Sequence, residues 1–173
     1  MGNMGGRNMT SFDFAEQLEW ANGFKDAGIA QILKARIPAC YDVQKADEAS
    51  DRSGTDYWAL RHNLPPLSID CKVRSIDPID KWDEDDLALE TWSVKGRSPG
   101  WTRDDTKRTD YILWFWTTSG RFELVPFPPL CKAFSLYWER WSAEYGPHEQ
   151  NSGRWQSECV FVPRDVIKAK IAD

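Results

Sequence analysis

Apolar side chains return at three- and four-residue steps near the start of the chain, the spacing of a helix that buries one face. Phe14, Leu18 and Ala21 follow this pattern and predict a helix over 11–23. A second helix is predicted over 25–37, because its apolar positions continue until a proline stops them. Two further stretches are expected to lie outside regular structure, the loosely ordered residues 1–10 and a polar surface connection over 41–54.

The period changes from helical to extended after residue 54. In the stretch 67–73 apolar residues alternate with Ser68, Asp70 and Lys72, so the acid and the amine share one face of a strand. Ser119 and Gly120 form a turn that predicts a hairpin. The other strands are predicted over 55–60, 87–94, 110–116, 121–125 and 158–162.

Aromatic residues form a helical stripe in the last third of the chain. The stripe follows Pro128 and Pro129 and ends before Gly146, which predicts a long helix whose aromatic face packs on a sheet. A short helix is predicted over 163–171. Helices, strands, a helix, a strand and a helix predict an α/β or α+β fold, with one central mixed sheet flanked by helices.

Length and composition narrow the class of protein. The chain has 173 residues, of which 41% are hydrophobic and 28% charged, values that predict one soluble folded domain over 11–173. No transmembrane span or signal peptide is apparent, so we expect a cytoplasmic protein with no membrane partner. Four cysteines without a C-x-x-C pair predict free thiols rather than a zinc site.

The net charge of −5 comes from one segment. Residues 77–86 contain six acids and one base, and the remainder of the chain is neutral overall. Like charges at this density repel one another, so the segment is expected to be an exposed connection. An acidic average therefore does not exclude a nucleic-acid partner.

Two carboxylates and an amine are predicted to converge. If the strands around Asp56 and Asp70 are neighbours, the two acids lie side by side, and Lys72 is on the same face. Paired carboxylates suit Mg²⁺ or Mn²⁺, and a nearby ammonium can position water or stabilise charge on a phosphate. The constellation predicts metal-assisted phosphodiester hydrolysis.

These residues resemble a known family. Gly54-Thr55-Asp56-Tyr57, followed by Ile69-Asp70-Cys71-Lys72, is similar to the PD-(D/E)XK nuclease superfamily, with Thr55 in place of the proline. The resemblance implies a restriction-endonuclease-like αβββαβ core with the acids on the first two strands of its meander. It also implies that Asp56 and Asp70 ligate the metal and that Lys72 is the motif lysine.

The same resemblance suggests further acids. An acid from the leading helix implies Glu16, or alternatively Glu19, as a metal ligand. Some phage members carry a Glu on the third strand and an Asp-Tyr pair on the fourth, which implies Glu90 as a catalytic and metal-binding residue and Asp110 as a weaker candidate. Hydrogen-bonded acids at strand ends are the structural alternative for both.

A basic stretch offers a surface for DNA, either duplex or branched. It includes Trp92 and Trp101, which could stack on bases. The alternative is a solvated loop whose charge is partly cancelled by Asp104 and Asp105. A homodimer would let such a nuclease reach both strands. The basic residues are Lys95, Arg97, Arg103, Lys107 and Arg108.

Two other functions stay open at this stage. The chain could be a nuclease fold that has lost catalysis and serves in DNA binding or assembly. Its ten tryptophans also allow an aromatic-rich carbohydrate-binding module, which would not need the Asp and Lys cluster. Cleavage of DNA with and without a divalent metal separates the enzyme from both.

Overall fold

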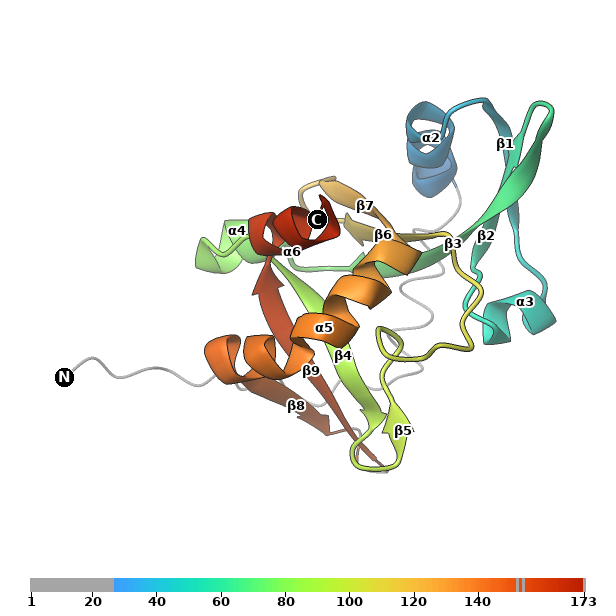
Figure 1. Cartoon of the computed structure of the whole chain (residues 1–173). Coiled ribbons are helices and arrows are strands. Elements are labelled where there is room, and N and C mark those ends of the chain that lie inside the picture. Colours follow the sequence, from blue (N-terminus) through green and yellow to red (C-terminus); the bar gives the residue numbers. More distant parts are fainter. Residues whose placement is uncertain (1–26, 152, 154, 173) are drawn as a thin grey trace.

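The computed structural model describes residues 27–151, 153 and 155–172. The predicted helix over 11–23, residues 1–10, Glu16 and Glu19 lie outside the described residues. Within them the chain is an α+β protein with five helices and two sheets (Figure 1). The helices are α2 (Ala27–Arg36), α3 (Glu48–Arg52), α4 (Pro78–Trp82), α5 (Phe127–Tyr145) and α6 (Arg164–Ala172).

The first sheet is mixed and has the strand order β1-β2-β3-β6-β7. Strands β1, β2 and β3 form an antiparallel meander, β3 runs parallel to β6, and β6 pairs antiparallel with β7. The parallel pair needs a crossover, which contains α4 and two strands of the second sheet. The bounds are β1 (Cys40–Lys45), β2 (Tyr57–Arg61), β3 (Leu64–Arg74), β6 (Tyr111–Trp116) and β7 (Phe122–Pro126).

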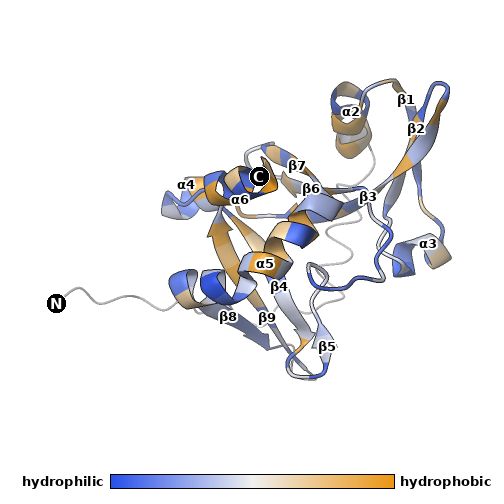
Figure 2. Cartoon of the chain, viewed as in Figure 1, coloured by the Kyte–Doolittle hydropathy of each residue, from blue (hydrophilic) through white to orange (hydrophobic). Residues whose placement is uncertain are grey.

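The second sheet is antiparallel and has the strand order β5-β4-β9-β8. Helices α5 and α6 pass over β4 and β9, whose covered parts are hydrophobic, whereas the outer strand β8 is hydrophilic (Figures 1 and 2). The bounds are β4 (Asp86–Val94), β5 (Ser98–Pro99), β8 (Pro147–Asn151) and β9 (Gln156–Pro163).

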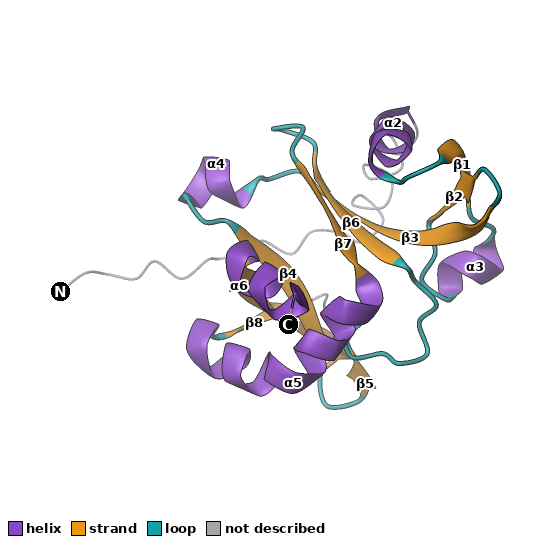
Figure 3. Ribbon diagram, turned by 45° about the horizontal axis from the view of Figure 1, so that its top comes forward, coloured by secondary structure: helices purple, strands orange, loops and turns teal. Residues whose placement is uncertain are grey.

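Two cores lie on opposite sides of the mixed sheet (Figure 3). On one side α2 packs on the apolar face of β2 and β3, including Ile69, Cys71 and Val73. On the other side Trp114 and Trp116 of β6 join the second sheet and α5. Because side chains of a strand alternate between faces, the residues between the apolar positions of β3 face the second core's side.

The structure confirms most of the sequence-predicted elements and corrects others. The helix predicted over 25–37, the hairpin of β6 and β7, the aromatic helix α5 and the terminal helix α6 are present. The polar connection predicted over 41–54 is wrong, because it contains β1 and α3. The single sheet is also wrong: the predicted third strand is β4, which pairs with β9 in the second sheet. Strand β8 was not predicted at all.

The acidic segment 77–86 departs from the expected exposed connection. It contains α4, and its first acid, Asp77, is only 2% exposed. Asp77 accepts hydrogen bonds from Ser119, from two nitrogens of Arg121 and from the backbone of Ile79. The charge density of the segment thus failed to predict the burial of Asp77, because its side-chain partners Ser119 and Arg121 lie more than 40 residues away.

Other expectations concern the cysteines and the membrane. All four cysteines are free, as predicted, and Cys71 and Cys159 are buried. No helix in the described part of the chain is long and apolar enough to cross a lipid bilayer.

Candidate active site around Asp70

Asp56 and Asp70 lie next to each other because β2 and β3 pair antiparallel. Tyr57 is opposite Ile69 in the register, and Asp56 immediately precedes it. The Asp56 N–H donates to the Ile69 carbonyl at 2.8 Å, and the Asp56 carboxylate accepts from the Cys71 N–H at 2.6 Å. These two bonds bracket Asp70 in the chain, so Asp56 lies opposite Asp70 across the antiparallel pair.

Asp70 is a buried carboxylate held by two ammonium groups. Its side chain is 5% exposed. The Nζ of Lys72 lies 2.6 and 2.9 Å from its two oxygens, and the Nζ of Lys107 lies 3.3 Å from one of them. Burial opposes ionisation, but the charges of Lys72 and Lys107 outweigh it and lower the pKa of Asp70. The carboxylate is therefore ionised and accompanied by cations.

Lys107 reaches Asp70 from the long segment between β5 and β6. This segment is fastened to the residues before β2: the Arg108 N–H donates to the Ser53 carbonyl, and the Thr109 hydroxyl donates to the Gly54 carbonyl at 2.5 Å. Gly54 has a φ of +97°, and a Cβ there would lie 3.0 Å from the Lys107 Nζ. The glycine therefore allows both the turn and the passage of the lysine.

Trp101 connects Lys72 with Glu90. The Lys72 Nζ lies 5.2 Å from the centre of the Trp101 ring. The backbone N–H of Trp101 donates to the Glu90 carboxylate at 3.0 Å. The same carboxylate accepts from the Ser93 hydroxyl at 2.7 Å. A Cβ on Gly100 would lie 2.1 Å from the Glu90 carbonyl oxygen, so this close approach requires glycine. Glu90 belongs to the second sheet and joins the site through Trp101.

Sequence reasoning missed Arg74, which continues the alternation of Asp70 and Lys72 along β3. It lines a small hollow of about 50 Å³ together with Glu90, Trp101 and Cys159. The period of two after Lys72 was the signal that could have found it.

The five basic residues proposed for DNA binding separate into three groups. Lys107 contacts Asp70, whereas Arg97 and Arg108 are exposed. Lys95 forms ion pairs with Glu149 and Glu158. The Arg103 guanidinium lies 4.7 Å from the Trp92 ring and 4.3 Å from the Trp138 ring. The side chains of Lys95 and Arg103 are therefore already engaged in contacts within the protein.

Asp110 has a structural environment. Its carboxylate accepts from the Ser68 backbone at 2.8 Å and from the Ser68 hydroxyl at 3.1 Å, and its own N–H donates to Ser68. These bonds fasten the start of β6 to β3, next to the candidate site.

The donor set suits a hard divalent cation. Asp56 and Asp70 carry carboxylate oxygens of the kind that could hold such a cation, and Asp70 is already accompanied by the ammonium groups of Lys72 and Lys107. The described residues contain no group of three His, Cys, Asp or Glu side chains arranged to hold a metal. Mg²⁺ commonly uses only one or two carboxylates and completes its coordination with water and phosphate oxygens. Two acids are therefore sufficient.

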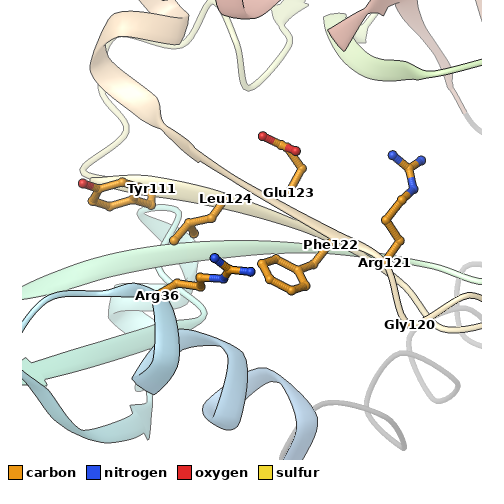
Figure 4. A pocket seen from close by; sticks show the side chains of 7 residues that line it. All are labelled: Arg36, Tyr111, Gly120, Arg121, Phe122, Glu123 and Leu124. Atoms are coloured by element: carbon orange, nitrogen blue, oxygen red, sulfur yellow. The ribbon is translucent and has the colours of Figure 1, made fainter. Parts of the chain in front are cut away.

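A larger hollow lies away from these residues. It runs along the edge strand β7, has a volume of about 550 Å³, and is lined by Arg36, Tyr111 and residues 120–124 (Figure 4). The Arg36 guanidinium stands 5.1 Å from the Phe122 ring. None of the sequence-predicted site residues lines it.

Comparisons of the chain with models of protein families, with curated proteins and with solved structures each found no match.

Proposed function

We propose that this chain is a metal-dependent nuclease that hydrolyses phosphodiester bonds of DNA. The observation that carries the proposal is the buried, ionised Asp70, flanked by Asp56 and paired with Lys72. The two carboxylates can bind a divalent cation, and the neighbouring ammonium group can bind a phosphate at the same point.

The element order supports a nuclease-like core. Helices α2 and α4 and strands β1, β2, β3 and β6 follow the αβββαβ order once two insertions are set aside, α3 between β1 and β2, and β4 and β5 of the second sheet in the crossover. The acids lie at the start of β2 and on β3, the second and third strands of the meander, instead of the first two. The difference arises because β1 was not expected from sequence.

Asp56 and Asp70 would hold Mg²⁺ or Mn²⁺, with Glu90 placed to support the site through Trp101. The bound cation would supply Lewis acidity toward a phosphate oxygen and toward the attacking water. Lys72 donates hydrogen bonds and can stabilise the negative charge that develops on the phosphate. Hydrolysis adds the water oxygen to phosphorus, breaks one P–O ester bond, and transfers a proton to the leaving oxygen.

The positions of the aromatic residues favour this proposal over sugar binding. Among the described tryptophans only Trp82 and Trp155 are exposed; Trp82 lies on α4 and Trp155 immediately before β9. A carbohydrate platform needs several exposed rings on one surface. Lys107 and Arg108 lie on the segment between β5 and β6 that borders Asp70, where they can meet a polyanionic backbone, whereas Arg97 lies in the turn between β4 and β5.

A cleavage assay tests the proposal. Purified protein is incubated with supercoiled plasmid, linear duplex and branched DNA, with Mg²⁺, with Mn²⁺ or with a chelator. We expect cleavage only with metal, and its loss in Asp56→Asn and Lys72→Met variants that retain the circular dichroism spectrum of the wild type.

The matched control is Asp42→Asn, which changes a partly exposed acid of β1 that pairs with Lys34, away from the site. It should cleave at the wild-type rate. Binding of DNA without any cleavage would favour the inactive nuclease fold, and cleavage that persists in both site variants would refute the assignment.

A further inference from the structure

Lys107 and Lys72 hold the same carboxylate in different ways. Lys72 contacts both oxygens of Asp70, at 2.6 and 2.9 Å, and its ammonium also lies over the Trp101 ring. Lys107 contacts one oxygen at 3.3 Å and comes from outside the sheet. Lys107 is the more weakly held of the two cations.

The placement of Lys107 is nevertheless built into the fold. Backbone and side-chain hydrogen bonds fix both residues that follow it, since Arg108 bonds to Ser53 and Ser68, and Thr109 bonds to Gly54. The lysine side chain is 19% exposed and passes over Gly54, where no Cβ obstructs it. The backbone around Lys107 is thus held in place and its ammonium reaches the site, whereas the side chain of Arg108 next to it is exposed.

A divalent cation bound by Asp70 would lie within a few ångströms of both ammonium groups. Like charges at this distance repel strongly in a partly buried site, so one lysine has to withdraw. Lys107 has the longer single contact and a flexible side chain, and its withdrawn ammonium would meet the phosphate that accompanies the metal.

We propose that Lys107 is the internal counter-ion of this site: it occupies the cation position at Asp70 in the absence of metal and moves to the DNA phosphate when metal binds. This inference rests on the proposed function. A variant without the Lys107 ammonium should therefore bind metal more tightly but cleave DNA more slowly, because the contact with the phosphate is lost.

The test measures Mn²⁺ binding to the full chain by electron paramagnetic resonance, without DNA. Lys107→Gln, which keeps most of the side-chain length, should bind Mn²⁺ at least five times more tightly than the wild type. Lys107→Arg should return the affinity to the wild-type range. Arg108→Gln removes the same charge one residue away and should change the affinity less than twofold.

The second readout is cleavage at saturating Mn²⁺, where Lys107→Gln should be at least fivefold slower than the wild type. If the wild type binds Mn²⁺ and Lys107→Gln shows no gain, or Arg108→Gln shows an equal gain, the counter-ion role is overturned while the proposed nuclease stands. If neither the wild type nor Lys107→Gln binds Mn²⁺, the proposed function itself fails, and this inference fails with it.

Discussion

Asp70 on β3 and Asp77 in the crossover that follows β3 are both buried aspartates, and their surroundings differ in kind. Asp77 accepts from a two-pronged Arg121, from the Ser119 hydroxyl and from the N-terminus of α4, and Arg121 also bonds to Asp85. Among the described residues, the side-chain partners of Asp70 are the ammonium groups of Lys72 and Lys107. A rigid arginine fork with fixed donors makes a structural brace, whereas flexible point charges can be exchanged for another cation.

Arg121 belongs to a wider network that ties several elements together. Arg164 of α6 bonds to Asp85 and to Glu123 of β7, and Lys168 bonds to Glu123 as well. The Arg121 guanidinium also lies 4.0 Å from the centre of the Trp116 ring. Burial of an acid is therefore insufficient to identify a functional site, and the nature of its partners decides.

The largest effect should come from Asp70→Asn. We expect DNA cleavage to fall by about 1,000-fold or more, because the lost cation binding contributes several kcal/mol to transition-state stabilisation. The free energy of unfolding should change by about 1 kcal/mol or less, because Lys72 and Lys107 can extend to water. Single-turnover cleavage and urea unfolding measure the two. If Asp70→Asn lost as much stability as an Asp77 variant, Asp70 would also have a structural role and would not differ from Asp77 in kind.

Asp77→Ala should have the opposite profile. It leaves Arg121 without its main partner and removes the N-cap of α4, so we expect the free energy of unfolding to fall by about 3 kcal/mol. Cleavage per folded molecule should stay at the wild-type rate. The exposed Asp80→Ala, on the same helix, serves as control and should lie within about 0.5 kcal/mol of the wild type. Equal effects of the two variants would contradict the brace.

The brace should also appear in the dependence of stability on pH. Hydrogen bonds from Arg121 lower the pKa of Asp77 to about 2, against an unfolded value near 4. A depressed carboxyl pKa stabilises the fold above the unfolded value, and this contribution is lost as the pH falls from about 4 to about 2. Thermal unfolding between pH 5 and pH 2 should show a smaller loss in Asp77→Asn than in the wild type. If the stability of Asp77→Asn and of the wild type fell in parallel with pH, Asp77 would not contribute this pH-dependent stability.

The smallest effect is expected at Trp101. Its ring lies under the Lys72 ammonium, a contact that contributes about 0.5–1 kcal/mol at a partly exposed position. Trp101→Leu should therefore slow cleavage by about two- to fivefold at saturating metal. Trp82→Leu, on α4, is the control and should be neutral. An unchanged rate for Trp101→Leu would show that the ring does not position Lys72.

The contact of Lys72 with Asp70 and the adjacency of β2 and β3 were predictable because both depend on local information. An alternation of period two puts Asp70 and Lys72 on one face, and a short connection makes β2 and β3 neighbours. The aromatic helix α5 was predictable for the same reason, since three- and four-residue spacing shows which side of a helix is buried.

Other features depend on partners that are distant in the chain. Strand β4 pairs with β9 about 70 residues later, so nothing near Glu90 indicates a second sheet. Strands β1 and β8 are short and largely polar, and neither has the alternation that reveals a strand. The contact of Lys107 with Asp70 and the burial of Asp77 by Arg121 likewise arise only from the folded topology.

The most direct measurement is anomalous diffraction from a crystal of the protein soaked in Mn²⁺. We expect an Mn²⁺ peak about 2.1 Å from a carboxylate oxygen of Asp70. Asp56 should ligate the same ion, and the Lys107 ammonium should have moved away from Asp70. An Mn²⁺ peak elsewhere, with both lysines still on Asp70, would contradict it.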